Sequence, residues 1–214
     1  MSEQNPLSDC RLYLISPATI DDPESFVATL SQALQGGDVA SFQLRLKDAD
    51  ENHIIKCAET LIPVCHSFDV IFIINDSAEI AAKVNADGVH LGQSDGEVKA
   101  ARDILGHNKV IGVTCHNSRH LAFEAGDKGA DYVAFGAFYP TTTKDVLHQA
   151  ELETLVWWSD LAEIPSVAIG GITVENCTAV ADAGADFIAV CSGVWDYAQG
   201  PQEAVKQFNE KLSQ

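Results

Sequence analysis

The chain has few positive charges: 13 Lys and Arg residues stand against 31 Asp and Glu residues, which leaves a net charge of −18. A surface this acidic repels nucleic acid and anionic lipid, so neither is expected as a partner. An anionic substrate would need a locally cationic pocket. Three of the scarce cations, Arg45, Lys47 and Lys144, fall at the ends of predicted strands, and such a pocket would form there.

The sequence also lacks a long apolar run. Although 46% of its residues are hydrophobic, no stretch approaches the roughly 20 residues that a membrane span requires. The N-terminus, M-S-E-Q-N-P-L-S-D, has no basic region followed by an apolar block, as a signal peptide would. We therefore expect a cytoplasmic protein with no membrane partner, in which residues 1–10 form a flexible or loosely packed N-terminal segment.

No two cysteines have the C-x-x-C spacing that is typical of zinc and thioredoxin-type sites. The cysteines, mostly flanked by apolar residues, are Cys10, Cys57, Cys65, Cys115, Cys177 and Cys191. Such surroundings favour buried, reduced thiols. Cys115, His116 and His120 have the side chains of a soft-metal site, but the sequence places no fourth ligand near them, so zinc is disfavoured.

Short apolar runs alternate with helix-period segments along the whole chain. The predicted strands are Arg11–Ile15, Ser41–Arg45, Val70–Ile74, Gly88–Leu91, Val110–Val113, Tyr132–Phe135, Ser166–Ile169 and Phe187–Val190. The helix-period segments include 23–35, 51–67, 77–85, 118–128, 173–183 and 201–212. Such alternation indicates an α/β protein with a parallel sheet, and eight repeats favour a closed (β/α)8 TIM barrel. Without a linker, residues 1–214 are expected to form a single domain.

One motif precedes the fourth, sixth and eighth predicted strands, in the forms N-A-D-G-V, G-A-D-Y-V and G-A-D-F-I. Its first residue tolerates positive φ, which lets the chain turn from a helix into the next strand. The aspartates of the motif, Asp87, Asp131 and Asp186, lie where strands begin. The chemistry of a TIM barrel lies at the opposite end of the strands, so we predict a structural role for these carboxylates.

Polar side chains follow the second and third predicted strands. In Q-L-R-L-K, period two puts Gln43, Arg45 and Lys47 on one face, where Arg offers a bidentate fork and Lys a point charge to phosphate. A solvated edge strand is the alternative. Asn75 offers an amide to a substrate, or else forms a turn.

Asp76 and Asp95 follow the third and fourth predicted strands. Mg²⁺ binds through one or two carboxylates together with substrate phosphate and water, so two aspartates suffice. Beside phosphate-binding cations, they suggest a diphosphate handled with Mg²⁺. The alternatives are a helix N-cap for Asp76 and a turn residue for Asp95.

The later strand ends carry hydroxyls and glycines. T-C-H places the Thr114 hydroxyl after the fifth strand, and F-Y-P-T-T-T-K supplies a Thr-rich loop with Lys144. Glycines in A-I-G-G-I-T and V-C-S-G allow backbone amides to approach an anion. We therefore expect two anion sites, a metal-assisted one near strands two to five and another near strands six to eight. His90 is expected to be a hydrogen-bonded interior or rim residue.

Taken in order, these motifs resemble the thiamine phosphate synthase family from about residue 11 to about residue 208. The resemblance implies a TIM barrel that joins hydroxymethylpyrimidine diphosphate to thiazole phosphate carboxylate and releases diphosphate. It also implies a dissociative mechanism, in which the methylene–oxygen bond breaks first and the thiazole nitrogen attacks a pyrimidinyl carbocation. No protein nucleophile is required.

The resemblance also implies roles for individual residues. The residues that would hold the pyrimidine diphosphate are Gln43, Arg45, Lys47, Asn75, Thr114 and Lys144. Asp76 and Asp95 would hold Mg²⁺. The residues that would surround the thiazole phosphate are Thr141, Thr143, Gly171, Cys191 and Ser192. Catalysis would fall to Arg45, Lys47 and Lys144, which stabilise the departing diphosphate, and to Thr114.

The chain departs from the family pattern at several positions. Thr114 stands where Ser is usual, Ala137 replaces a Pro, no Gly follows Lys144, and Cys191 stands where an aliphatic residue is common. The related thiazole tautomerase is a weaker alternative, because it needs neither the paired carboxylates nor the full Q-x-R-x-K. The other alternative is a phosphate-binding barrel without turnover. Whether the chain forms a homo-oligomer is left open.

Overall fold

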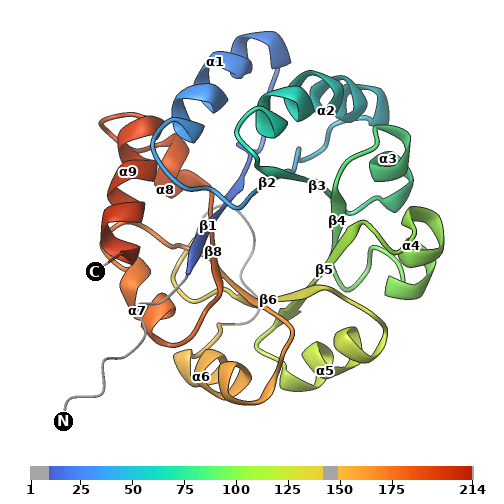
Figure 1. Cartoon of the computed structure of the whole chain (residues 1–214), viewed down its shortest axis with the longest axis vertical. Helices are drawn as coiled ribbons and strands as arrows, with labels where there is room; N and C mark the ends of the chain where they lie inside the picture. The colour runs from blue at the N-terminus through green and yellow to red at the C-terminus, as the bar shows by residue number, and fades with distance from the viewer. Residues whose placement is uncertain (1–9, 142–148, 214) are drawn as a thin grey trace.

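Eight parallel strands close into a barrel in the computed structural model, which describes residues 10–141 and 149–213. The strands are β1 Arg11–Ile15, β2 Ser41–Leu44, β3 Ile71–Asn75, β4 Gly88–Leu91, β5 Val110–His116, β6 Tyr132–Gly136, β7 Ser166–Ile169 and β8 Phe187–Val190. Each pairs with the next, and β1 pairs with β8 to close the ring. Viewed down the barrel, the helices form an outer ring (Figure 1). The predicted TIM barrel is confirmed.

Helices follow the strands around this ring. They are α1 Pro23–Leu34, α2 Glu51–His66, α3 Ala78–Lys83, α4 Val98–Leu105, α5 Arg119–Asp127, α6 Leu152–Leu161, α7 Cys177–Asp182, α8 Ser192–Trp195 and α9 Pro201–Leu212. The sequence did not indicate α4, α6 and α8. Helices α4 and α8 are short, and α6 is apolar on two faces: Trp158 is buried while Val156 and Leu161 are exposed. Short length and apolar residues on two faces both weaken the 3.6-residue hydrophobic period by which a helix is recognised in a sequence.

Two strand boundaries differ from the prediction in a way that matters for the site. Strand β2 ends at Leu44, so Arg45 and Lys47 lie in the following loop. Strand β5 continues to His116, with a register shift between Thr114 and His116. The prediction that T-C-H follows the strand is therefore wrong, because these residues extend the ladder with β6.

The core has an inner and an outer part, as the alternation of side chains along a strand requires. The inner cluster fills the barrel and consists of Tyr13, Ile15, Ile73, Tyr132, Ala134, Val167 and Ala189. The outer cluster lies between strands and helices and includes Phe42, Phe72, Phe135 and Trp158. Burying each large apolar side chain contributes about 1.5–3 kcal/mol. This packing anchors the strands whose ends carry the site.

The repeated aspartates each bind the start of a neighbouring strand. Each Oδ2 accepts a backbone N–H one strand back: Phe72 to Asp87 at 2.8 Å, Ile111 to Asp131 at 2.7 Å and Ser166 to Asp186 at 2.8 Å. The residues that open the motif have positive φ: Asn85 at 53°, Gly129 at 94° and Gly184 at 95°. The predicted structural role of these three carboxylates is confirmed.

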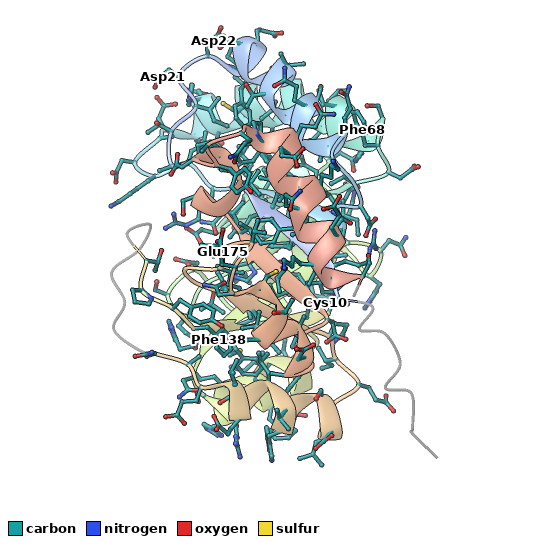
Figure 2. The ribbon with its side chains drawn as sticks, turned by 90° about the vertical axis from the view of Figure 1, so that its left-hand side faces the viewer. Cys10, Asp21, Asp22, Phe68, Phe138 and Glu175 are labelled. Atoms are coloured by element: carbon teal, nitrogen blue, oxygen red, sulfur yellow. The ribbon has the colours of Figure 1, made fainter. Side chains whose placement is uncertain are left out.

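The two ends of the barrel carry different kinds of connection. Figure 2 views the barrel from the side, with Asp21, Phe138 and Glu175, which follow strands, toward one end and Cys10 and Phe68, which precede strands, toward the other. Residues 1–9, expected to be loosely packed, lie outside the described residues, whereas Cys10 is buried. In the ranges 10–141 and 149–213, no helix combines the length and the apolar character of a membrane span.

Candidate active site

A polar layer lines the inside of the barrel above the apolar inner cluster. Gln43 on β2 is only 2% exposed, and its Nε2 donates to Oδ1 of Asn75 on β3 at 3.2 Å. Asn75 is the register partner of His90 on β4, and the hydroxyl of Thr114 on β5 lies 2.8 Å from His90 Nε2. Burial of so many polar groups is tolerated because they bind one another.

The loop after β2, which carries Arg45 and Lys47, is held by the loop after β1. The backbone N–H of Arg45 donates to Ser16 Oγ at 2.9 Å, and the Ser16 hydroxyl lies 3.1 Å from the Arg45 carbonyl oxygen. The N–H of Lys47 donates to the carbonyl of Ala18 at 2.9 Å. Ser16 is 1% exposed. These bonds fix the backbone of both cationic residues beside the barrel mouth.

Asp76 does not cap the helix that follows it. Ser77 is the N-cap of α3, and its Oγ accepts the N–H of Ile80 at 3.2 Å. Asp76 itself has φ of 67°, and its N–H donates to the carbonyl of His90 at 2.8 Å. The capping interpretation of Asp76 is therefore wrong, and its exposed carboxylate extends from a backbone tied to β4.

Asp95 closes a turn after β4, as its alternative interpretation proposed. Its Oδ2 accepts the N–H of Gly92 at 2.9 Å, and its Oδ1 accepts the Ser94 hydroxyl at 3.2 Å. A Cβ at position 92 would overlap this carboxylate, so a larger residue there would force the Asp95 side chain to shift. Each carboxylate oxygen has two lone pairs, so the turn leaves acceptor capacity for a ligand. Asp76 and Asp95 are thus both bonded to the end of β4, through His90 and Gly92.

The oxygen donors of Asp76 and Asp95 are of the type that hard cations prefer. Within the part of the chain that the structure describes, no three His, Cys, Asp or Glu side chains gather closely enough to hold a metal ion. Two carboxylates are too few to fill the coordination shell of a metal ion with protein ligands alone. They are enough for Mg²⁺, which completes its shell with phosphate oxygens and water.

Gly171 lies where the loops after β6 and β7 touch. Its φ is 64°, and a Cβ there would overlap Tyr139 and the carbonyl of Pro140. The side-chain amide of Asn176 donates to the Gly171 carbonyl at 3.0 Å. Thr141, which follows Pro140 in the sequence, is half-buried. Thr143 and Lys144 lie outside the described residues.

Cys191 and Ser192 lie at the end of β8. Cys191 precedes α8, and its thiol donates to the carbonyl of Ser16 at 3.3 Å. Burial raises the pKa of this thiol to about 11, so it stays protonated at neutral pH. Ser192 is exposed. Ser16 therefore connects the β8 end of the rim with the loop that carries Arg45.

The T-C-H segment divides between the two faces of β5. Thr114 points into the barrel, and its carbonyl accepts the side-chain amide of Gln93 at 2.6 Å. Cys115 is fully buried in the outer cluster, where burial raises its pKa to about 12. His120 is 82% exposed on α5 and lies 3.6 Å from Glu124. Cys115 and His120 thus do not face a common point.

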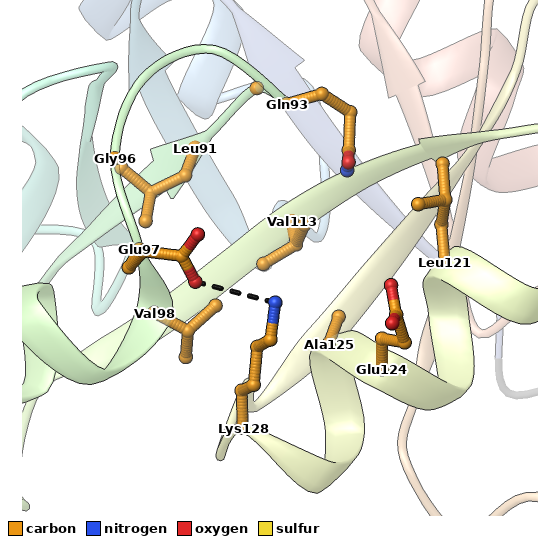
Figure 3. Close-up of a pocket in the computed structure, with 11 residues that line it drawn as sticks. Leu91, Gln93, Gly96, Glu97, Val98, Val113, Leu121, Glu124, Ala125 and Lys128 are labelled. Atoms are coloured by element: carbon orange, nitrogen blue, oxygen red, sulfur yellow. Dashed lines mark ion pairs between the residues drawn. The ribbon is translucent and has the colours of Figure 1, made fainter.

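A separate hollow lies outside the barrel between α4 and α5, lined in part by Val98, Leu121 and Ala125 (Figure 3). Lys128 Nζ and Glu97 Oε2 form an ion pair across it at 3.3 Å. The hollow contains none of the predicted site residues, although Gln93 lines it. The hollow lies between helices on the outside of the barrel, so we place the site in the barrel mouth instead.

Sequence reasoning missed residues that support the site through distant contacts. Tyr13 and Tyr132 lie inside the barrel, Ser16 is buried just after β1, and the indole of Trp195 donates to the carbonyl of Ile15 at 2.6 Å. Ser16 gave a detectable signal, because it is a polar residue directly after a strand. The tyrosines gave none, since an aromatic residue in a short strand is equally consistent with simple packing.

A closed (β/α)8 barrel with cations, carboxylates and hydroxyls after its strands defines a TIM-barrel enzyme with an anion-binding mouth. A family model described as thiamine monophosphate synthase matches residues 12–194. The chain belongs to this family.

Individual relatives agree with the family match. The chain is 53% identical to a thiamine-phosphate synthase of Rhodospirillum centenum over 206 residues, covering 96% of this chain and 99% of the relative. It is 50% identical to one of Erythrobacter litoralis, covering 95% of each. A thiamine phosphate pyrophosphorylase structure from Pyrococcus furiosus superimposes with a TM-score of 0.83 at 31% identity, covering 97% of this chain and 98% of that one. The chain is therefore a transferase of thiamine biosynthesis, and the resemblance inferred from its motifs is confirmed.

Proposed function

We propose that the chain couples hydroxymethylpyrimidine diphosphate to thiazole phosphate carboxylate, yielding thiamine phosphate and diphosphate. The observation that carries the proposal is the arrangement of Asp76 and Asp95. Both residues are hydrogen-bonded to the end of β4. The N-cap of α3 is Ser77, so helix capping does not explain the presence of Asp76. An exposed carboxylate on a left-handed backbone, next to a helix that another residue caps, is consistent with a ligand site.

The pyrimidine diphosphate binds, on this proposal, over strands β2 to β5. The buried amides of Gln43 and Asn75 and the hydroxyl of Thr114 orient it from inside the barrel. Arg45 and Lys47 bind the phosphate oxygens from the loop after β2, and Lys144, outside the described residues, contributes a third positive charge. Preorganised positive charge at a leaving group lowers the barrier because that group gains negative charge as the bond breaks.

The thiazole phosphate binds at the opposite side of the mouth, near Thr141, Gly171, Cys191 and Ser192, and Thr143, outside the described residues, is proposed as a further contact. The left-handed backbone of Gly171, where a Cβ would overlap Tyr139 and the carbonyl of Pro140, lets the loops after β6 and β7 meet closely on this side. Mg²⁺ would be held by Asp76 and Asp95 and would neutralise negative charge on the diphosphate.

The reaction proceeds without a protein nucleophile. The methylene–oxygen bond of the pyrimidine substrate breaks, its electron pair leaves with the diphosphate, and the thiazole nitrogen then bonds to the methylene carbon. The burial of Cys115 and Cys191 supports this, since their raised pKa values, about 12 and about 11, keep both thiols protonated. The residues of the chain orient the substrates and stabilise the departing anion.

Incubation of the protein with both substrates and Mg²⁺ tests the proposal. We expect thiamine phosphate and diphosphate in equal amounts, and neither when one substrate or Mg²⁺ is omitted. Failure to form product from authentic substrates, with a correctly folded protein, would overturn it. The cytoplasmic location and the choice between monomer and homo-oligomer stay predictions, which fractionation and light scattering would test.

A further inference from the structure

Four side chains from four different strands form a hydrogen-bonded series across the barrel interior. We call this series of Tyr13, Tyr132, His90 and Thr114 the buried hydroxyl chain. The two phenol oxygens are 2.9 Å apart, Tyr132 Oη lies 2.9 Å from His90 Nδ1, and His90 Nε2 lies 2.8 Å from Thr114 Oγ1. The exposed fractions of Tyr13, Tyr132 and His90 are 4%, 7% and 8%. The series thus runs from the apolar inner cluster to the polar layer at the mouth.

Gly112 on β5 makes room for this series. It is the register partner of both His90 on β4 and Tyr132 on β6, so it lies directly between them. A Cβ at position 112 would overlap the phenol ring and hydroxyl of Tyr132. The missing side chain lets the Tyr132 ring cross β5 and stack on His90, with ring centroids 5.6 Å apart.

The direction of the hydrogen bonds follows from Tyr13, the residue at the end of the series that lies away from the barrel mouth. Among the residues that the structure describes, Tyr132 is the hydrogen-bond partner of the Tyr13 hydroxyl. A buried O–H that donates to nothing is costly, so Tyr13 donates to Tyr132. Tyr132 then donates its own hydrogen to His90 Nδ1. Burial raises the pKa of both phenols, so they remain donors at neutral pH.

With Nδ1 accepting from Tyr132, the hydrogen of the His90 ring lies on Nε2, which donates to Thr114 Oγ1. The oxygen of Thr114 accepts this bond, and its own hydrogen is left to point elsewhere. Thr114 is half-buried at the barrel mouth. The series therefore orients one donor toward the space where an anionic ligand binds.

We propose that Tyr132 is a positioning residue that holds His90 as the Nε2–H tautomer and thereby aims the Thr114 hydroxyl hydrogen at an anionic oxygen of the bound substrate, while Tyr13 completes the series as the donor to Tyr132. The identity of that oxygen, on the diphosphate, rests on the proposed function. The tautomer of His90 does not, because it is argued from the contacts of the ring with Tyr132 and Thr114.

Long-range ¹⁵N–¹H NMR on the full-length protein tests the tautomer, since the two ring nitrogens of a neutral histidine give distinct shifts. The His90→Gln variant assigns the signal among the 7 histidines. We expect the Nε2–H pattern in the unmodified protein, and an Nδ1–H or cationic pattern would overturn the proposal. Tyr132→Phe is expected to lose the pattern. Tyr13→Phe is expected to keep it, because Tyr132 still donates to His90. An unchanged pattern in Tyr132→Phe would remove the role of Tyr132.

A double-mutant cycle connects the series to turnover. Tyr132→Phe is expected to lower kcat about tenfold with little change in KM, which is the loss of an interaction made in the transition state. In the Thr114→Val background it should add little, because the hydroxyl that it positions is already absent. Thr114→Ser should retain the effect. Full additivity with Thr114→Val would contradict the proposal. If no variant turns over, the NMR result still decides the tautomer, so failure of the proposed function is distinguishable.

Discussion

Asp76 combines an unusual local conformation with the ligand-binding role that we propose for it. Its φ of 67° lies in the left-handed region, which Asp and Asn tolerate better than other non-glycine residues. The N–H bond to the His90 carbonyl holds the backbone there. The carboxylate is exposed and the adjacent Ser77 caps the helix. A substitution at position 76 can therefore remove the negative charge of the side chain while keeping the left-handed backbone conformation.

We expect Asp76→Asn to lower Mg²⁺-dependent coupling roughly 100-fold or more, the equivalent of about 3 kcal/mol, because the ligand charge is lost. Its melting temperature should stay close to that of the unmodified protein, since Asn tolerates positive φ. Asp76→Ala should lose activity equally and be less stable, because Ala does not. Initial rates against Mg²⁺ concentration and thermal melts provide the measurement. Full activity of Asp76→Asn would refute the metal assignment.

At the scale of elements, the repeated aspartates bind strands to one another. Asp131, before β6, accepts the backbone N–H of Ile111 on β5 and the guanidinium of Arg102 on α4, which lies 2.6 Å away. Arg102 also donates to three backbone carbonyls, those of Gly106, Lys109 and Gly129. One carboxylate therefore joins two strands and a helix at the end of the barrel opposite the site.

We expect Asp131→Ala to lower the free energy of unfolding by about 1–3 kcal/mol, because a buried strand N–H loses its acceptor. Activity per folded molecule should not change, since the residue lies far from the mouth. Urea unfolding measures the effect, and Asp160→Ala on the exposed face of α6 is the matched control. Equal stability of the two variants would contradict the role assigned to the repeat.

The buried thiols make the packing of strands against helices sensitive to alkali. Burial raises the pKa of Cys115 from 9.0 to about 12. A raised folded-state pKa contributes stability that is present below pH 9 and lost as the pH rises through 12. The free energy of unfolding should therefore fall across this window, and less steeply in Cys115→Ala. Identical slopes for both proteins would show that this thiol does not contribute.

At the scale of the whole molecule, the net charge of −18 opposes compaction. Raising sodium chloride from about 0.01 M to about 0.15 M shortens the screening length from roughly 30 Å to roughly 8 Å. We expect the melting temperature to rise over this range. A variant in which exposed Glu59 and Glu163 are replaced by Gln should respond less. A fall in the melting temperature with salt would contradict the prediction.

Local patterns were sufficient for most of the architecture. The eight strands were found because each is a short apolar run between turn-forming residues, and α9 was predicted with the boundaries that it has. The end of β5 was not found, because the strand continues through polar residues that only β6 can pair with. Similarly, α6 was missed because its apolar residues face both the core and solvent.

The sequence by itself determined the order of motifs, the placement of rare cations after strands and the presence of carboxylates beside them. These depend on residue type and spacing, which need no distant partner. Only the tertiary structure decided that Ser77 caps α3 rather than Asp76, and that Tyr13 reaches Tyr132 across 119 positions of the chain. Barrel closure creates such contacts by bringing remote strands together, and no local propensity encodes which buried hydroxyls then meet.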